Sequence, residues 1–166
     1  MRRVVTHVAA LIVAWPVLAA EPSGCDKFAW PLDKEQQLLG AAQPIQDGAE
    51  IDRDASQAVS VTLAPLEAAK LPVAPERQPR RGSGFAGYVR FGKAPSVGAY
   101  KVTLSEGAWI DVVQDDRFLK PTAFTGATDC PHVRKSVKFE IGPAPFTLQL
   151  SDSPANAIAV VVTPAD

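Results

Sequence analysis

The sequence predicts an all-β fold, namely an antiparallel β-sandwich that is jelly-roll-like and carries a short N-terminal helix. Apolar and polar residues alternate in seven short runs between residues 57 and 163, as they do in strands with one face buried. The chain of 166 residues contains 15 Pro and 11 Gly, which suits strands joined by turns better than a helical bundle. No helical pattern separates the runs, and this disfavours a parallel βαβ architecture.

The first 20 residues have the pattern of a secretory signal peptide. Arg2 and Arg3 precede an uncharged, mostly apolar run that ends in small residues. We expect cleavage near Ala19 or Ala20, which places the mature protein in the periplasm or outside the cell. A retained membrane anchor is the alternative, but the run is short for a spanning helix, which needs about 20 apolar residues. The sequence therefore predicts no transmembrane span after cleavage.

Cys25 and Cys130 are the two cysteines of the chain, and we expect them to form a disulfide. An even number of cysteines in an exported protein is typical of a bridge, with two free thiols as the alternative. Cys25 also invites comparison with a lipoprotein anchor. Pro22 stands where such a motif has an aliphatic residue, so we disfavour lipidation.

The region after the signal peptide divides into an N-terminal helix and connector, residues 21–56, and a β-sandwich domain, residues 57–166. Within residues 25–42, the side chains of Leu32, Gln36 and Leu39 share one face of the predicted helix. Residues 43–56 are polar and acidic and are predicted to connect the helix to the first strand.

The predicted strands supply a core of inward-facing apolar residues: Val89, Phe91, Tyr100, Val102, Leu104, Ile110, Val112, Val137, Phe139, Ile141, Phe146, Leu148, Leu150, Ile158 and Val160. Three short loops are each predicted to close a hairpin. They pair Phe91 with Gly98, Leu104 with Ala108, and Ile141 with Phe146. The second hairpin requires a left-handed Gly107.

Residues 85–163 resemble the bacterial pre-peptidase C-terminal type of secreted β-sandwich. The segments that carry the resemblance are GYVRF, GAYKVTLSEGAWIDVV, PFTLQL and AIAVVV. The whole chain is also similar to small exported proteins of proteobacteria. The resemblance implies a secreted sandwich and transfers no catalytic residue.

Most enzyme chemistries lack their residues in this sequence. A cupin-like dioxygenase holds iron with two or three His and a carboxylate, but only His132 remains once the signal peptide is removed. No G-x-S-x-G motif, zinc spacing, P-loop or dinucleotide fingerprint occurs. The sequence thus predicts no metal and no cofactor. A small hydrolase with two carboxylates stays an alternative, although we interpret Asp115 and Asp116 as a solvated turn.

The predicted hairpins place one set of polar and aromatic side chains on the outer face of the sheet: Tyr88, Arg90, Lys101, Thr103, Trp109 and Asp111. Two aromatic rings among charges form a surface suited to a sugar ring or a peptide. The alternative is that the Pro-rich segment 64–84 folds over this face and buries Trp109.

We therefore expect an exported, non-catalytic β-sandwich module that binds a component of the cell envelope, either a polysaccharide or a protein. A structural or accessory subunit is a further alternative. Removal of Arg2 and Arg3 leaves the 18 acidic residues in excess over the basic ones, so the mature chain has no positive field to attract nucleic acid.

Overall fold

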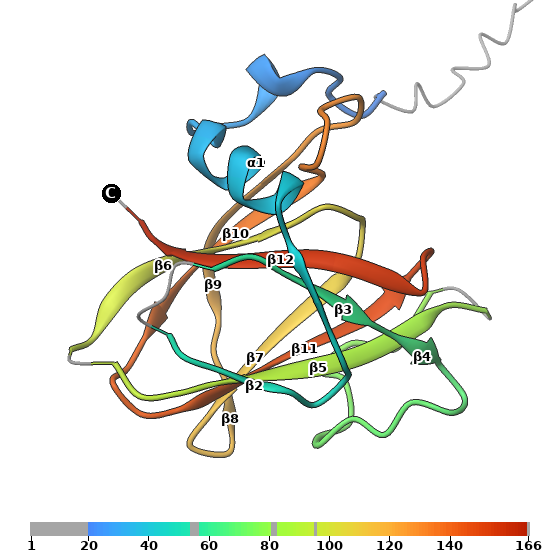
Figure 1. The fold of residues 1–166 in the computed structure, drawn as a ribbon, viewed down its shortest axis with the longest axis vertical. Helices are drawn as coiled ribbons and strands as arrows, with labels where there is room; N and C mark the ends of the chain where they lie inside the picture. The colour runs from blue at the N-terminus through green and yellow to red at the C-terminus, as the bar shows by residue number, and fades with distance from the viewer. Residues whose placement is uncertain (1–19, 54–56, 81–82, 95, 166) are drawn as a thin grey trace, which may run out of the picture.

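Two sheets face each other across one apolar core in the computed structural model, which describes residues 20–53, 57–80, 83–94 and 96–165 (Figure 1). We call them sheet one and sheet two. The strands of sheet one, in spatial order, are β1 (Gln43–Ile45), β3 (Val59–Thr62), β12 (Ala157–Pro164), β6 (Gly98–Leu104), β10 (Lys135–Ile141) and β9 (Pro121–Gly126). Those of sheet two are β2 (Glu50–Ile51), β5 (Phe85–Phe91), β11 (Phe146–Ser153), β7 (Trp109–Gln114) and β8 (Arg117–Phe118), with β4 (Ala64–Pro65) also on β5.

The all-β prediction is confirmed, and the sheets are mixed rather than purely antiparallel. The two parallel pairs are β1 with β3 and β2 with β5. Both involve residues 43–51, part of the segment 43–56 that was predicted to connect the helix to the first strand. This segment, which we call the 43–51 strap, runs along one sheet and then the other because Ile45 and Ile51 can each pack against the core from the side.

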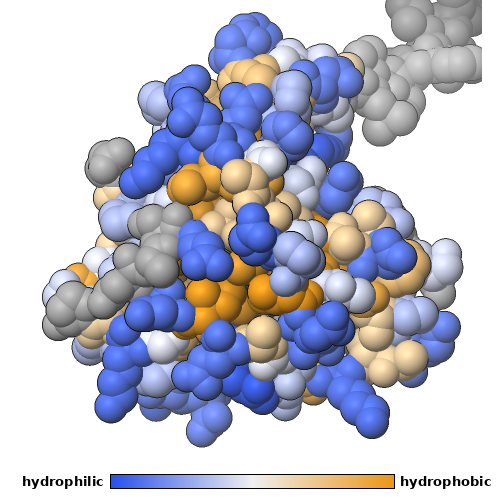
Figure 2. All heavy atoms as spheres, in the orientation of Figure 1, coloured by the Kyte–Doolittle hydropathy of each residue, from blue (hydrophilic) through white to orange (hydrophobic). Residues whose placement is uncertain are grey.

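The strap crosses the open side of the sandwich, where Figure 2 shows apolar side chains gathered in the middle of the face and polar ones around them. Main-chain bonds fix it there: Gly48 N donates to Tyr88 O at 2.8 Å, and Arg90 N donates to Ala49 O at 2.9 Å. Gly48 has φ +79°, and a Cβ at this position would meet the Tyr88 hydroxyl at 2.8 Å. A glycine is therefore required where the strap turns.

The core is the one predicted from the alternation of residues. Every predicted core residue belongs to it, and among them only Tyr100 is partly rather than fully buried. Residues 98–114 contain strands and no helix. The rings of Phe91 and Phe146, which are opposite each other on β5 and β11 of sheet two, stack with 4.7 Å between their centres.

The three predicted hairpins are wrong, because each of their short loops carries the chain from one sheet to the other. β5 and β7 belong to sheet two, whereas β6 lies in sheet one between β12 and β10. Likewise β10 is in sheet one and β11 in sheet two. Gly107 is not left-handed; among the described glycines only Gly24 and Gly48 have positive φ.

The predicted helix forms over Asp33–Gly40 (α1), after one turn of 3₁₀ helix over Cys25–Lys27 (η1). Asp33 and Glu35 lie in its first turn, where their negative charges stabilise the helix by interacting with the positive end of the helix dipole. The helix lies on the outer face of sheet one (Figure 1), where Leu32 and Leu39 pack against Val133 and Val161. This second apolar cluster holds the N-terminal region on the sandwich.

The Cys25–Cys130 disulfide is confirmed, with 4.8 Å between the Cα atoms. It joins η1 to the connection between β9 and β10. Both sulfur atoms are held in this bridge, and no cysteine of the described residues is free. The predicted signal peptide lies outside the described residues except for Ala20. No helix within the described part of the chain is long and apolar enough to cross a membrane.

Candidate ligand site

The residues predicted to form one outer surface lie on two different sheets. Sheet two carries four of them: Tyr88 and Arg90 on β5, and Trp109 and Asp111 on β7. Lys101 and Thr103 are on β6 in sheet one, where Lys101 has Lys138 and Thr163 as its register neighbours. The predicted pairing of Lys101 with Asp111 is wrong, because the chain changes sheet between β6 and β7.

Lys101 and Thr103 are buried beneath α1. The Lys101 Nζ atom lies 2.9 Å from Glu35 Oε1, which also accepts a hydrogen bond from Thr163 Oγ1 at 2.5 Å. The hydroxyls of Thr103 and Ser136 are hydrogen-bonded at 2.9 Å. Burial opposes the ionisation of Glu35, but the hydrogen bonds from Thr163 and Lys101 outweigh it and hold the pKa of Glu35 below its ordinary value. The contacts of Glu35 with Lys101 and Thr163 attach the helix to sheet one.

The Pro-rich segment contacts both Trp109 and Asp111. The alternative interpretation expected it to bury Trp109, but only Asp111 is buried. Asp111 Oδ2 accepts a hydrogen bond from Glu76 N at 3.1 Å, and Asp111 Oδ1 accepts one from Trp109 Nε1 at 2.8 Å. The Arg77 guanidinium lies 4.9 Å from the centre of the Trp109 ring. Burial raises the pKa of Asp111. Trp109 is half-buried, and its face is occupied by the protein's own arginine.

Gln149 is the main anchor of this cover. Its buried side chain accepts a hydrogen bond from Val73 N at 2.9 Å and donates one to Val73 O at 3.0 Å. We expect Gln149→Ala to lower the free energy of unfolding by about 2 kcal/mol, since two buried bonds are lost. Trypsin cleavage after Lys70 should become faster than in wild type. Gln37→Ala on the exposed side of α1 is the control, and unchanged cleavage would contradict the anchoring role.

Tyr88 and Arg90 remain at the surface as a pair. Arg90 Nη2 donates to the Tyr88 hydroxyl at 3.2 Å, and the guanidinium carbon lies 4.8 Å from the centre of the Tyr88 ring. Arg90 Nη1 donates to Gly48 O at 3.0 Å. The strap and Tyr88 therefore fix the orientation of an exposed positive charge.

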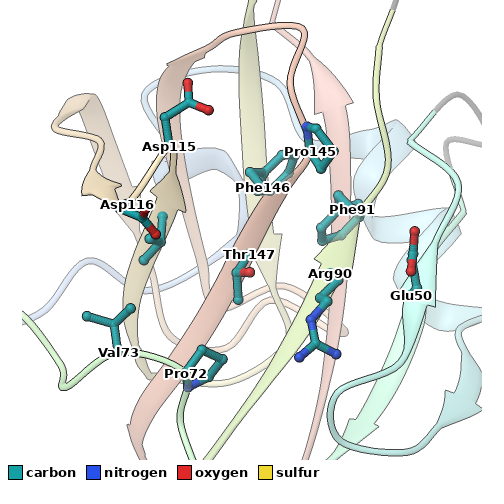
Figure 3. A pocket seen from close by; sticks show the side chains of 11 residues that line it. Glu50, Pro72, Val73, Arg90, Phe91, Asp115, Asp116, Pro145, Phe146 and Thr147 are labelled. Carbon is teal, nitrogen blue, oxygen red and sulfur yellow. The ribbon is translucent and has the colours of Figure 1, made fainter.

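Arg90 borders an open hollow of about 430 Å³ at one end of the outer face of sheet two (Figure 3). Its floor follows one row of the sheet, in which Thr147 lies between Arg90 and Val113. The other lining residues are Glu50, Pro72, Val73, Phe91, Asp115, Asp116, Pro145 and Phe146. In Figure 3, Arg90 and Glu50 stand on one side of Thr147, and Asp115 and Asp116 stand on the other.

Asp115 and Asp116 form the two-residue turn between β7 and β8. Both have positive φ, 51° and 58°, as a type I′ hairpin turn requires. Aspartate tolerates this conformation better than most residues. Both side chains are exposed, so the interpretation as a solvated turn holds, and the same turn forms one wall of the hollow.

His132 lies away from the hollow, in the connection between β9 and β10. It is exposed, and its ring contacts the C-terminal end of α1, where a Cβ on Gly40 would meet His132 Cδ2 at 3.3 Å. Within the described residues no group of three or more His, Cys, Asp or Glu side chains could hold a metal ion.

Comparison of the chain with protein-family models, with curated proteins and with solved structures gives no match.

Sequence reasoning found Arg90 and Tyr88 as surface residues and Asp115 and Asp116 as a solvated turn, but it did not bring Arg90 and the turn together in one hollow. Thr147 is an outward residue of β11, and the alternation of residues 146–150 would have placed it beside Arg90 if β11 had been paired with β5. Pro72 reaches the hollow on a loop and Glu50 on the two-residue strand β2, and neither segment is long enough or regular enough to show a periodic pattern.

Proposed function

We propose that this protein is an exported, non-catalytic module that binds a component of the cell envelope in the hollow on sheet two. The observation that carries the proposal is a fixed positive charge, Arg90, facing a pair of exposed carboxylates across a floor that presents the hydroxyl-bearing Thr147. Such a lining offers donors and acceptors to one small polar group.

Two features support export. The N-terminal sequence has the order of a basic start, an apolar run and small residues that precedes signal cleavage. The Cys25–Cys130 disulfide suits an oxidising compartment, because cytosolic thiols are generally kept reduced.

The chemistry of the hollow favours a saccharide or a peptide over a lipid chain. Glu50, Asp115 and Asp116 accept hydrogen bonds, Arg90 donates them, and the rings of Pro72 and Pro145 supply apolar surface. These carboxylates are exposed, so a ligand can reach them from solvent. This supports binding as the role of the hollow.

The test is co-sedimentation of the mature protein with purified peptidoglycan sacculi, run beside a pull-down from periplasmic extract. We expect retention by one of these two materials. Arg90→Ala should weaken that retention about tenfold, because a charged hydrogen-bond donor is lost from the site. Asp116→Asn should also weaken the retention, because it removes one of the two carboxylate charges of the turn.

Glu140→Gln is the matched control, since Glu140 is an exposed carboxylate on sheet one, away from the hollow. Binding that is equal in Arg90→Ala and wild type would overturn the assignment of the hollow. No binding to either material would overturn the proposed function.

A further inference from the structure

The outer edge of β9, the side that faces away from β10, differs from the other sheet edges in the described structure. The remaining edge strands are only two or three residues long, and each contains a proline or a charged residue: Pro44 in β1, Glu50 in β2, Pro65 in β4 and Arg117 in β8. β9 has six residues, Pro121–Gly126, and none is charged. Short length, proline and charge are the devices that prevent edge-to-edge pairing, and β9 keeps only the proline at its start.

The register shows which main-chain groups of β9 point outward. Ala127 N donates to Arg134 O at 3.2 Å, so this pair is hydrogen-bonded toward β10. The hydrogen-bonded pairs alternate along an antiparallel ladder. The N–H and C=O groups of Phe124 and Gly126 therefore face away from β10.

Thr128, two residues after Gly126, shows that alternate main-chain groups point away from β10. Thr128 N donates to Pro22 O, and Thr128 O accepts from Gly24 N, both at 2.8 Å. The N-terminal segment thus occupies the edge at Thr128. No backbone partner is seen for the outward groups of Phe124 and Gly126 among the described residues.

The side chains of β9 also suit a contact. Phe124 is 76% exposed, the most exposed large apolar side chain in the described structure. Its neighbour Ala123 is small, and Thr125 is buried, with its hydroxyl accepting a hydrogen bond from Ala29 N at 2.9 Å. An exposed aromatic ring beside free main-chain donors and acceptors is typical of a strand that accepts another strand.

We propose that the β9 edge pairs in antiparallel orientation with the β9 edge of a second copy of this chain, with the two-fold axis at Phe124. In this register Phe124 forms two main-chain hydrogen bonds with Phe124 of the second copy. Ala123 comes opposite Thr125 of the second copy.

A second copy fits this edge for two reasons. The strand carries no charge, so that two identical strands do not repel each other, and the register places small residues opposite one another with the two rings at the centre. A two-fold contact of this kind also uses both edges at once, so that it closes as a dimer. The contact is small, and we therefore expect a dimer that dissociates on dilution.

The test measures the mass of the mature, disulfide-bonded chain by sedimentation equilibrium over a wide concentration range. Wild type should approach twice the mass of a single chain. Phe124→Glu should remain a single chain throughout, because it places like charges opposite each other at the axis. Phe124→Ala should raise the dissociation constant of the dimer about tenfold, because the contact between the two aromatic rings is lost.

Val97→Glu is the matched control, since Val97 is 64% exposed and lies between β5 and β6, away from the β9 edge. It should dimerise as wild type does. Phe124→Pro gives a second test of the main-chain bonds, because it removes an outward N–H and leaves the bonds to β10 intact.

Circular dichroism of each variant shows whether the sandwich has folded. A wild-type chain that stays single at all concentrations would overturn the proposal, and so would a dimer that persists in Phe124→Glu. A single chain that instead binds an extended peptide at Phe124 would assign the edge to another protein and would equally overturn it.

Discussion

Replacing both Cys25 and Cys130 with serine is expected to lower the free energy of unfolding by about 4–5 kcal/mol. The bridge joins residues 105 positions apart, and closing so long a loop removes much conformational freedom from the unfolded chain. The cross-link also holds η1 and α1 on the outer face of sheet one, where Leu32 and Leu39 are buried. Urea denaturation followed by circular dichroism measures the loss.

Wild-type protein in strong reductant provides the control for this experiment. It should unfold at the same urea concentration as the double variant, because both lack the cross-link. The variant itself should not respond to reductant. If oxidised wild type and variant unfold at the same urea concentration, the bridge does not stabilise the fold.

Lys101→Met is the second large effect that we expect, with a loss of about 3–5 kcal/mol. It leaves Glu35, which is 1% exposed, as an unpaired carboxylate between α1 and sheet one. The double variant Glu35→Leu/Lys101→Met should recover most of the loss, since an apolar pair of similar volume needs no solvation. Urea denaturation of the two single variants and the double variant measures this.

Lys138→Met is the matched control, because Lys138 lies opposite Lys101 on β10 and its Nζ is 4.4 Å from the centre of the Trp30 ring. It undergoes the same chemical change but leaves no buried charge. We expect it to cost about 1 kcal/mol, the value of a cation–π contact between partly exposed side chains. Equal losses in the two lysine variants would contradict the role of the buried pair.

The dependence on pH separates loss of charge pairing from loss of packing. The pKa of Glu35 is lowered in the folded protein, so its ionisation stabilises wild type above the ordinary value of 4.5, and this stability is lost as the pH falls through the lower folded-state pKa. In Lys101→Met, protonation of Glu35 removes the unpaired charge. The difference between wild type and variant should therefore shrink in acid, and a difference that is constant with pH would indicate packing alone.

The core could be predicted from the sequence because alternation reports which side chains face inward. Alternation does not show to which of the two sheets a strand belongs. Val102 and Ile110 were predicted to be neighbours in one hairpin, and they instead face the core from opposite sheets. A loop of four residues can serve as a hairpin turn or as an arch between sheets, and both leave the same residues inside.

The wrong assignment of β6 and β7 to one hairpin also misplaced part of the candidate site. Lys101 was predicted to join the outer surface of sheet two and is buried on sheet one, because the loop before β7 is an arch. Asp111 and Trp109 were placed on the correct face. Whether the Pro-rich segment lies over them could not be decided from the sequence, because that segment has no repeating pattern from which its path can be predicted. Arg90 depended only on the local alternation of β5, and its exposure was predicted correctly.

The position of β12 determines at which stage of its synthesis the chain can complete sheet one. β12 is the last strand in the chain, yet it lies between β3 and β6, where Val160 pairs with both Val59 and Leu104. An incomplete chain lacks the strand that joins the two halves of sheet one, and Cys25 must likewise wait for Cys130. Contacts between such distant residues form slowly. Sheet one therefore cannot be completed until residues 157–164 have been synthesised, so that this sheet cannot form step by step as the chain grows.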